Sequence, residues 1–511
     1  MPATTVAPVA NRGMITVSIM LATIMQALDT TIANVALPHM QGSLSAAQDQ
    51  ISWVLTSYIV AAAVATPLTG WLSDRIGRKR LFLISVAGFT VASLLCGIAT
   101  SLGEMVMFRL AQGIFGAGLV PLSQAVLLDI NPPDRHGSAM AIWGAGIMVG
   151  PILGPTLGGY LTETFNWRWV FLINLPVGLV AFAGILTFVH ESRRNASRRF
   201  DLFGFAMLAL AIGAFQLMLD RGELKDWFSS GEIVMEAGIA ALAFYLFIAH
   251  SATADRPFLE MSLFRDRNFV TGLVFIFIVG IILLATLALL PPMLQNLLDY
   301  PVLTTGLVLA PRGIGTMIAM LVVGRLVNRF DPRLLILAGL LLTALSLWDM
   351  TGFSLDIGTW DLVRTGITQG LGLGFIFVPL STVTFATLAP RLRTEATALY
   401  SLVRNLGSSV GISIVIALLS RNIQINHATL AENVTPFNKL FRFPDVPSVW
   451  SLANPAGLAA FDAEINRQAA MIAYLNDFKL MMIVTLLAVP LLLAMRVSRG
   501  AASAPHVAAA D

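Results

Sequence analysis

The stretch Gly70-Trp71-Leu72-Ser73-Asp74-Arg75-Ile76-Gly77-Arg78-Lys79-Arg80 joins two long apolar runs of the chain. A weaker copy, Gly324-Arg325-Leu326-Val327-Asn328-Arg329-Phe330-Asp331, follows 254 positions later (324 − 70). A short basic turn between two apolar runs is typical of a loop between membrane spans, and its recurrence indicates an internal repeat. The two motifs therefore predict an all-α membrane protein built from two related halves.

The composition of the chain supports this class. Apolar residues make up 56% of the 511 residues, charged residues make up 12%, and the mean hydropathy is +0.78, whereas soluble domains contain roughly 25% charged residues. The net charge of +3 comes from basic loops and gives no indication of nucleic-acid binding. The single cysteine, Cys96, excludes an intramolecular disulfide, and its apolar surroundings predict a buried structural thiol.

Fourteen apolar runs are long enough to cross ~30 Å of hydrocarbon as helices. They lie near residues 14–34, 52–72, 81–100, 105–128, 137–161, 169–189, 202–219, 231–249, 269–290, 303–323, 334–352, 361–386, 395–419 and 478–496. The loops on the N-terminal side of the membrane carry 20 Lys and Arg residues, and the six short loops opposite carry 3. The positive-inside rule therefore predicts two cytoplasmic termini and an outward, periplasmic segment at 421–477.

Further repeated motifs define the halves. Arg109 with Gln112-Gly113 is matched by Arg364 with Gln369-Gly370, and Val120-Pro121-Leu122-Ser123 is matched by Val378-Pro379-Leu380-Ser381. We predict a cytoplasmic tail at 1–13, an N-terminal six-helix half at 14–190, two inserted helices at 201–250, a C-terminal six-helix half at 265–496 and a cytoplasmic tail at 497–511. Internal repeats of this kind underlie many secondary transporters.

These motifs resemble the fourteen-span drug:proton antiporter family of the major facilitator superfamily, and within it the EmrB-type pumps of Gram-negative inner membranes. The resemblance covers about residues 14–496, and its motifs lie at 28–38, 70–80, 109–113, 150–159, 166–176 and 219–228. It implies a major facilitator fold with fourteen transmembrane helices, arranged as two six-helix halves plus two inserted helices. It also implies a secondary active transporter that uses the proton gradient and no cofactor.

The loop motif is a candidate gate. Gly70 and Gly77 permit close helix approach and unusual backbone angles, and Asp74 can accept hydrogen bonds at a helix N-terminus or pair with an arginine. A clasp of this kind would hold one conformation of a transporter and release in another. The alternative is that Arg75, Arg78 and the following basic residues only set the topology, which leaves Asp74 and the glycines unexplained.

Asp29 is the only carboxylate well inside a predicted span and is the first candidate for proton coupling. Burial opposes its ionisation and a neighbouring arginine favours it, so a carboxylate that alternates between the two settings can carry a proton. The alternative is a permanently capped carboxylate, held by Thr30, Thr31 or a neighbouring helix. The resemblance assigns the arginine of the fourth span, Arg109, a part in proton transfer, although its predicted depth also allows its side chain to snorkel to the outer surface.

Several polar residues are candidates for a central cavity. They are Asn34 in the first span, Gln112 in the fourth, and Arg404 with Asn405 in the thirteenth. Arg404 lies mid-span, where an ionisable group faces a cavity or binds a backbone carbonyl. Arg312 and Arg364 are weaker candidates.

The fifth span carries Gly146, Gly150, Gly154 and Gly158 at intervals of four, with Pro151, Pro155 and Gly159 beside them. A stripe of small residues on one helical face lets a neighbouring helix approach closely, and prolines bend the helix. Tight packing alone would explain the stripe. The resemblance implies in addition that this antiporter motif seals the cavity against leak.

Motifs of hydrolases, ATPases and metalloenzymes are absent from the sequence, so we expect a transporter and not an enzyme, with no metal site. The favoured function is proton-coupled export of hydrophobic or amphipathic toxic compounds, that is, multidrug efflux. The alternatives are a transporter of one specific metabolite and a membrane protein that binds ligands without transport. The resemblance implies a multi-pass protein of the bacterial inner membrane, partnered by a periplasmic adaptor protein and an outer-membrane channel. Segment 421–477 would be a docking surface for the adaptor or a solvated cap.

Overall fold

The computed structural model describes residues 11–47, 50–191, 199–327, 329–435, 437–438 and 454–495. The regular secondary structure of these residues is helical. Thirteen helical segments are long and apolar enough to cross a membrane, and a bent pair brings the number to fourteen. The prediction of a fourteen-span helical membrane protein is confirmed. The predicted tails at 1–13 and 497–511 lie almost entirely outside the described residues.

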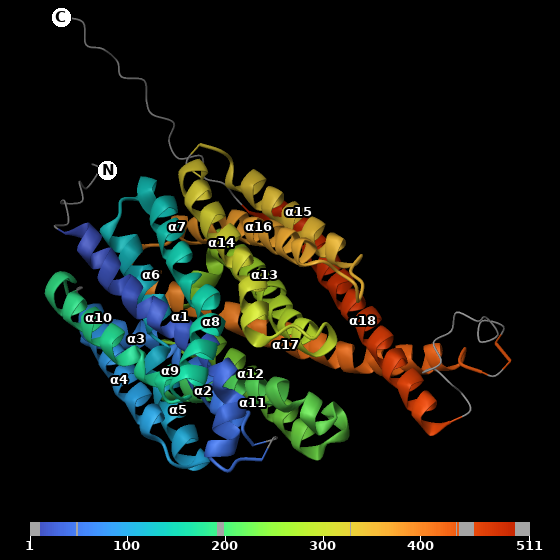
Figure 1. The fold of residues 1–511 in the computed structure, drawn as a ribbon. Helices are drawn as coiled ribbons and strands as arrows, with labels where there is room; N and C mark the ends of the chain where they lie inside the picture. The colour runs from blue at the N-terminus through green and yellow to red at the C-terminus, as the bar shows by residue number, and fades with distance from the viewer. Residues whose placement is uncertain are drawn as a thin grey trace, which may run out of the picture.

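The six N-terminal spans lie together on one side of the bundle (Figure 1). Several of them consist of two helices in sequence, because glycine or proline interrupts the apolar run. The bounds are α1 (Arg12–Ser43), α2 (Trp53–Ala65) with α3 (Leu68–Ile76), α4 (Arg78–Ile98), α5 (Leu102–Gly116) with α6 (Leu119–Ile130), α7 (His136–Ile147) with α8 (Val149–Thr164), and α9 (Trp169–Leu172) with α10 (Asn174–Phe188). The bend between α2 and α3 is 56° and follows Pro67.

The six C-terminal spans form the second half and are separated from the first by two inserted helices. The inserted helices are α11 (Leu202–Arg221) and α12 (Gly231–Thr253). The spans of the second half are α13 (Arg267–Pro292), α14 (Val302–Leu326), α15 (Pro332–Met350), α16 (Thr359–Ala386), α17 (Arg393–Ala431) and α18 (Pro455–Leu487). Side-chain oxygens of Asp266, Asp331 and Asn454 accept hydrogen bonds from backbone N–H groups at the starts of α13, α15 and α18, which satisfies groups that a helix end leaves unpaired.

The two halves pack through helices of matching position. The fifth span of the first half, α7 with α8, packs on α14, the second span of the other half. The reciprocal contact places α17, the fifth span of the second half, on α3 and α6. The exchange of equivalent contacts is the arrangement expected of a duplicated bundle.

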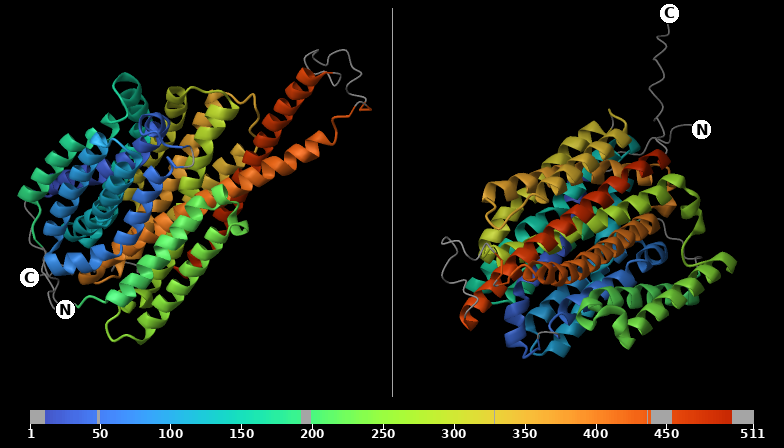
Figure 2. Two further views of the ribbon diagram at one scale, coloured as in Figure 1. Left: turned by 90° about the horizontal axis from the view of Figure 1, so that it is seen from below. Right: turned by 90° about the vertical axis from the view of Figure 1, so that its right-hand side faces the viewer.

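The inserted helices lie beside the bundle, where α11 touches both halves (Figure 2). Thr56 of α2 donates a hydrogen bond to Asp220, and the Arg221 guanidinium lies 5.2 Å from the ring centre of Trp53. On the other side, Gln216 Nε2 donates to Ser409 Oγ at 2.9 Å. The end of α11 therefore bridges α2 and α17.

The helices α17 and α18 extend beyond the rest of the bundle as an antiparallel pair (Figures 1 and 2). They contain 39 and 33 residues, whereas about 20 residues cross a bilayer. The predicted spans at 395–419 and 478–496 correspond to candidate membrane-spanning helices, and polar helix continues where each apolar run ends. His427 and Asp462 pair across the projection at 2.9 Å. Pro436 and Trp450 of the predicted outward segment lie outside the described residues.

Candidate functional site

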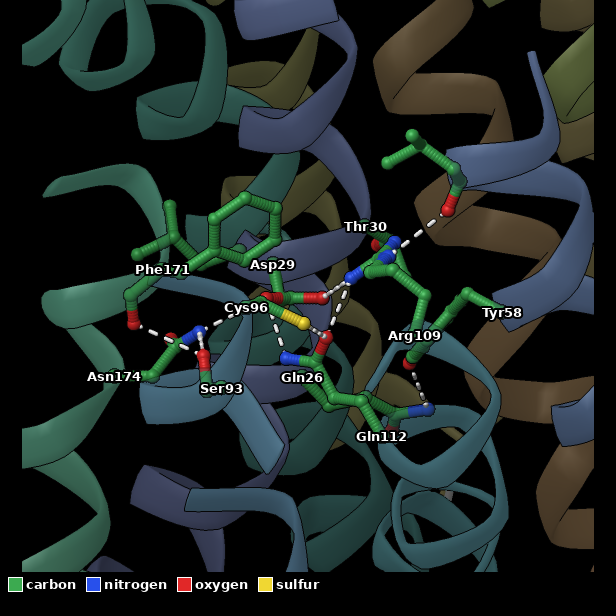
Figure 3. A network of polar contacts seen from close by, with 12 residues as sticks. Gln26, Asp29, Thr30, Tyr58, Ser93, Cys96, Arg109, Gln112, Phe171 and Asn174 are labelled. Carbon is green, nitrogen blue, oxygen red and sulfur yellow. Dashed lines mark hydrogen bonds and ion pairs between the residues drawn. The ribbon is translucent and has the colours of Figure 1, made fainter. Parts of the chain in front are cut away.

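A buried ion pair lies inside the N-terminal half (Figure 3). Arg109 Nη1 of α5 donates to Asp29 Oδ2 of α1 at 2.7 Å, and the two side chains are 1% and 0% exposed. A charged group in such surroundings is stable only when it is paired and hydrogen-bonded. The sequence predicted a role for each residue, and the structure brings the two together across 80 positions of sequence.

The carboxylate of Asp29 is also held by two amides. Gln112 Nε2 and Asn174 Nδ2 each donate to Asp29 Oδ1 at 2.9 Å. Asn174 donates to Ser93 Oγ as well, and Ser93 Oγ donates to the backbone oxygen of Phe171, both at 2.9 Å. Four spans thus converge on one carboxylate: the first, third, fourth and sixth.

The guanidinium of Arg109 is held as closely as its partner. Its Nε donates to the backbone oxygen of Val54 at 3.0 Å, and its Nη1 also donates to Gln112 Oε1 at 2.7 Å. The ring of Tyr58 lies 4.3 Å from the guanidinium carbon, within the range of a cation–π contact. The expectation that Arg109 can snorkel to the surface is wrong, because its hydrogen bonds lie within the bundle.

The structure corrects two further predictions about the residues around Asp29. The hydroxyls of Thr30 and Thr31 donate to backbone oxygens of Ala27 and Leu28, so they do not cap the carboxylate; neighbouring helices, which the alternative also named, hold it. Gln112 is fully buried and belongs to the Asp29 network, so it does not line a cavity. Asn34, one helical turn after Thr30, is exposed.

The thiol of Cys96 lies at the edge of the same network. It is fully buried, and its Sγ donates to Gln112 Oε1 at 3.7 Å. The predicted buried thiol is therefore present in the structure.

The glycines of the fifth span face α1. A Cβ atom at Gly150 would lie 2.6 Å from the backbone carbon of Ala27, and one at Gly154 would lie 2.1 Å from Thr31 Oγ1. The stripe therefore lets α8 approach the segment of α1 that carries Asp29. Gly159 is an exception, because a Cβ atom there would meet nothing within 4 Å. Gly159 therefore has no part in the close packing that we predicted for this motif. Pro151 lies in the first turn of α8, and Pro155 lies inside it.

The loop motif joins α3 to α4 and contacts the opposite half. Gly77 has φ of +94°, a conformation that L side chains rarely adopt. A Cβ atom at Gly70 would lie 3.0 Å from the Cα atom of Glu395, at the start of α17. Both glycines of the motif are thus required by the backbone or by a close approach.

A carboxylate outside the motif completes a charged clasp between the halves. Asp129, near the end of α6, forms ion pairs with Arg78 of the loop motif and with Arg393 of α17, the latter at 2.8 Å. We call these three residues the clasp. Asp74 interacts electrostatically with Arg78, and Arg75 is exposed. Sequence reasoning missed Asp129 and Arg393, because they lie 264 positions apart in segments that match no charged motif.

The candidate residues of the C-terminal half occupy different settings. Arg404 is partly exposed and its Nη2 donates to Asn405 Oδ1 at 3.5 Å, while Asn405 is exposed. Arg364 is 51% exposed and pairs with Asp349 at 3.1 Å. Arg364 is therefore not the structural counterpart of the buried Arg109.

A second carboxylate lies inside a span. Asp477 of α18 is 1% exposed, and its Oδ2 has no hydrogen-bond partner among the described residues. Asp477 did not stand out in the sequence and falls one residue before the predicted span at 478–496. The reason is that α18 begins well before the apolar run on which the predicted span was based.

Two duplicated helical halves, clasped at one end and with a buried ion pair in one half, are the architecture of a secondary transporter. Comparisons with known proteins agree with this class. Residues 19–412 match the Major Facilitator Superfamily. The chain is 37% identical over 445 residues to the multidrug export protein EmrB of Escherichia coli K12, which covers 87% of this chain and 86% of the relative. It is 39% identical over 427 residues to the fatty acid resistance protein FarB of Neisseria gonorrhoeae, which covers 83% and 84%.

A solved structure shares the fold. The MFS proton:xylose symporter XylE superposes with a TM-score of 0.60 at 14% identity, over 92% of this chain and 94% of that one. The chain belongs to the major facilitator superfamily and, within it, to the EmrB-type multidrug export proteins. It is therefore a multi-pass membrane transporter and not an enzyme.

Proposed function

We propose that this protein is a proton-coupled antiporter of the bacterial inner membrane that exports hydrophobic or amphipathic toxic compounds by alternating access. The observation that carries the proposal is the ion pair between Asp29 and Arg109, buried at the meeting point of four spans. The coarser function, multidrug export, follows from the EmrB-type relatives.

The network supplies a mechanism for coupling. The ionised carboxylate accepts three hydrogen bonds, one each from Arg109, Gln112 and Asn174. A proton on Asp29 removes the charge that Arg109 neutralises, so the buried guanidinium loses its counter-ion and the network must rearrange. Protonation and helix movement are thereby linked, because Asp29 and its three donors belong to three different spans, the first, fourth and sixth.

The glycine stripe connects this network to the helix contacts that must change. Gly150 and Gly154 lie against Ala27 and Thr31, immediately before and after Asp29 on α1. A shift of α1 that follows protonation would first change its contacts with α8, which also packs on α14 of the other half. The antiporter motif would therefore pass the state of Asp29 to the interface between the halves.

The clasp supplies the gate. Asp129, Arg78 and Arg393 hold the halves together at the end of the bundle that carries the loop motif. With both termini in the cytoplasm, this end is cytoplasmic, so the clasp closes the transporter on that side. Opening to take up a compound from the cytoplasm requires that Asp129 separate from Arg393, because Arg78 lies in the same half as Asp129.

A tripartite pump would carry the export route across both membranes, through a periplasmic adaptor protein and an outer-membrane channel. The projecting part of α17 and α18 is the surface we assign to the adaptor, because it extends several helical turns past the other spans. It carries exposed apolar side chains, including Ile425 and Leu458. Deletion of the projection with retained adaptor capture would contradict this assignment.

The test of coupling is drug-induced proton release in sealed proteoliposomes under an imposed pH gradient. The wild type should release protons in response to several chemically unrelated compounds, and Asp29→Asn should release none while it still folds and inserts. Glu104→Gln, which removes an exposed carboxylate of the same half, is the matched control and should behave as wild type. Antiport that persists in Asp29→Asn would end the assignment of Asp29. A response to one compound alone would favour the specific-metabolite transporter.

A further inference from the structure

The C-terminal half contains a second buried polar centre, which repeats part of the Asp29 network. In the first half, Gln112 Nε2 of the fourth span donates to Asp29 of the first span. In the second half, Gln369 Nε2 of the fourth span, α16, donates to Thr286 Oγ1 of the first span, α13, at 3.3 Å. Both pairs are related by one offset of 257 positions (286 − 29 and 369 − 112). The two hydrogen bonds are therefore equivalent, and Thr286 stands where Asp29 stands.

The arginine of this second centre comes from a different span. The same offset takes Arg109 to Gly366 (366 − 109 = 257), which has no side chain. Arg312 of α14 packs against that position, because a Cβ atom at Gly366 would lie 3.6 Å from Arg312 Cβ. Its Nη2 donates to the backbone oxygen of Leu283 at 3.1 Å. Leu283 precedes Thr286 by three residues, so Arg312 and Gln369 reach α13 within one helical turn of each other.

The second centre has a guanidinium and an amide but no carboxylate. Arg312 is 5% exposed and forms no ion pair within the described part of the chain, and its Nη1 has no hydrogen-bond partner there. Gln369 is fully buried, and its Oε1 also has no partner. A buried guanidinium without a counter-ion is unfavourable in a membrane protein. The C-terminal half, which has Thr at position 286 and not a carboxylate, thus contains groups that could bind one.

We propose that the centre formed by Arg312, Gln369 and Thr286 is an anion site, and that its ligand is the carboxylate of an amphipathic acid. The ligand's carboxylate would take the place that Asp29 occupies in the other half, accepting from Arg312 Nη1 and from the second N–H of Gln369 Nε2. The inference rests on the proposed export function for its physiological meaning, because it names a substrate class for that function. It requires α13, α14 and α16 to separate slightly, since the centre is occluded in this conformation.

Asp477 is the carboxylate of this chain that would compete with a ligand for Arg312. It lies one turn before Met481, whose sulfur accepts from Thr286 at 3.7 Å. Among the described residues Asp477 forms no ion pair with Arg312, and its Oδ2 has no partner. A movement of α18 that brought the two together would fill the centre without a ligand. The test therefore includes a variant of each residue.

The experiment measures octanoate binding to the full-length protein in nanodiscs by titration calorimetry in a low-chloride buffer, with empty nanodiscs subtracted. Octanol and octyltrimethylammonium are the neutral and cationic probes of equal chain length. We expect octanoate to bind at least tenfold more tightly than either, and Arg312→Gln to weaken octanoate at least tenfold. Arg364→Gln, which removes the exposed arginine of the same half, and Asp477→Asn should each stay within twofold of wild type.

Several results would overturn the proposal. They are unchanged octanoate affinity in Arg312→Gln, loss of binding in Asp477→Asn, and binding of chloride or acetate as tight as that of octanoate. If Arg312→Gln does not fold, Arg312→Lys keeps the charge and should keep measurable binding. Hydrogen exchange of the wild type gives an answer without any variant: octanoate should slow exchange in peptides containing 283–286, 312 and 366–369, and no slowing there contradicts the site. The assay needs no gradient and every variant in it keeps Asp29, so octanoate binding is measured independently of proton coupling and a failure of one is distinguishable from a failure of the other.

Discussion

Replacement of Asp129 by Asn should open the clasp between the halves. The carboxylate is shared by Arg78 and Arg393, whose side chains are 13% and 14% exposed, while Asp129 itself is 32% exposed. A hydrogen bond to a charged group contributes about 1.5–3 kcal/mol when buried, but an exposed ion pair contributes only ~0.2–1 kcal/mol. Only the pair with Arg393 crosses between the halves, and for its intermediate exposure we take roughly 1 kcal/mol.

A loss of about 1 kcal/mol changes the ratio of clasped to open molecules by roughly fivefold, since about 1.4 kcal/mol corresponds to a factor of ten. Spin labels at Pro133 and Ala389 report this ratio, because both positions are exposed and lie at the clasped end, one in each half. The background is Cys96→Ala, which removes the only native thiol. Double electron–electron resonance should show mainly the short distance in the wild type and an increased longer-distance population in Asp129→Asn.

Asp255→Asn is the matched control, because it neutralises an exposed carboxylate in the loop after α12 that does not contribute to the clasp. It should leave the distance distribution unchanged. Arg393→Gln should reproduce most of the effect of Asp129→Asn, and the double variant should not be additive. A folded Asp129→Asn protein whose ratio changes less than threefold would refute the role of the clasp.

Two further predictions concern the Asp29 network and the helix that packs on it. Gly150→Ala should destabilise the protein by about 1–3 kcal/mol through overpacking, because its Cβ atom would meet the backbone of Ala27; Gly159→Ala, with open space around it, should be neutral or slightly stabilising. Thermal unfolding of the two variants in the same detergent checks the pair, and equal losses would contradict the packing argument. Arg109→Lys should abolish antiport although it keeps the charge, because one ammonium cannot replace the fork that reaches Asp29, Gln112 and the oxygen of Val54. Proton release equal to that of wild type would show that charge alone is required.

Much of the candidate site could be predicted from the sequence, because its residues are of types that are costly inside a membrane. Asp29 and Arg109 stand out in apolar runs, and Gly77 stands out in a short turn where only unusual backbone angles fit. Uncharged polar residues such as Asn and Ser are common in spans, so they did not stand out in the sequence. Asn174 and Ser93 hold the carboxylate and its amide, but a single Asn or Ser in a helix is unremarkable until its neighbour is known.

The repeat illustrates both the reach and the limit of sequence comparison. The recurring Gln-Gly pair led to Gln369, which forms the equivalent hydrogen bond. The arginine three to five residues before that pair led to Arg364, which is exposed, whereas the buried arginine of the second half is Arg312 on another helix. Spacing along one helix cannot reveal that the buried guanidinium of the second half comes from a neighbouring span, because its location depends on which helices pack together.

The sequence by itself determined the class of this protein, the number of its spans and their division into two halves. These properties are local, because hydropathy over about 20 residues decides whether a segment can lie in hydrocarbon. Only the tertiary structure decided which polar groups meet: Asp29 with Asn174 across 145 positions, and Asp129 with Arg393 across 264. In a bilayer each buried polar group must find its partner within the protein, and the packing of the helices selects that partner.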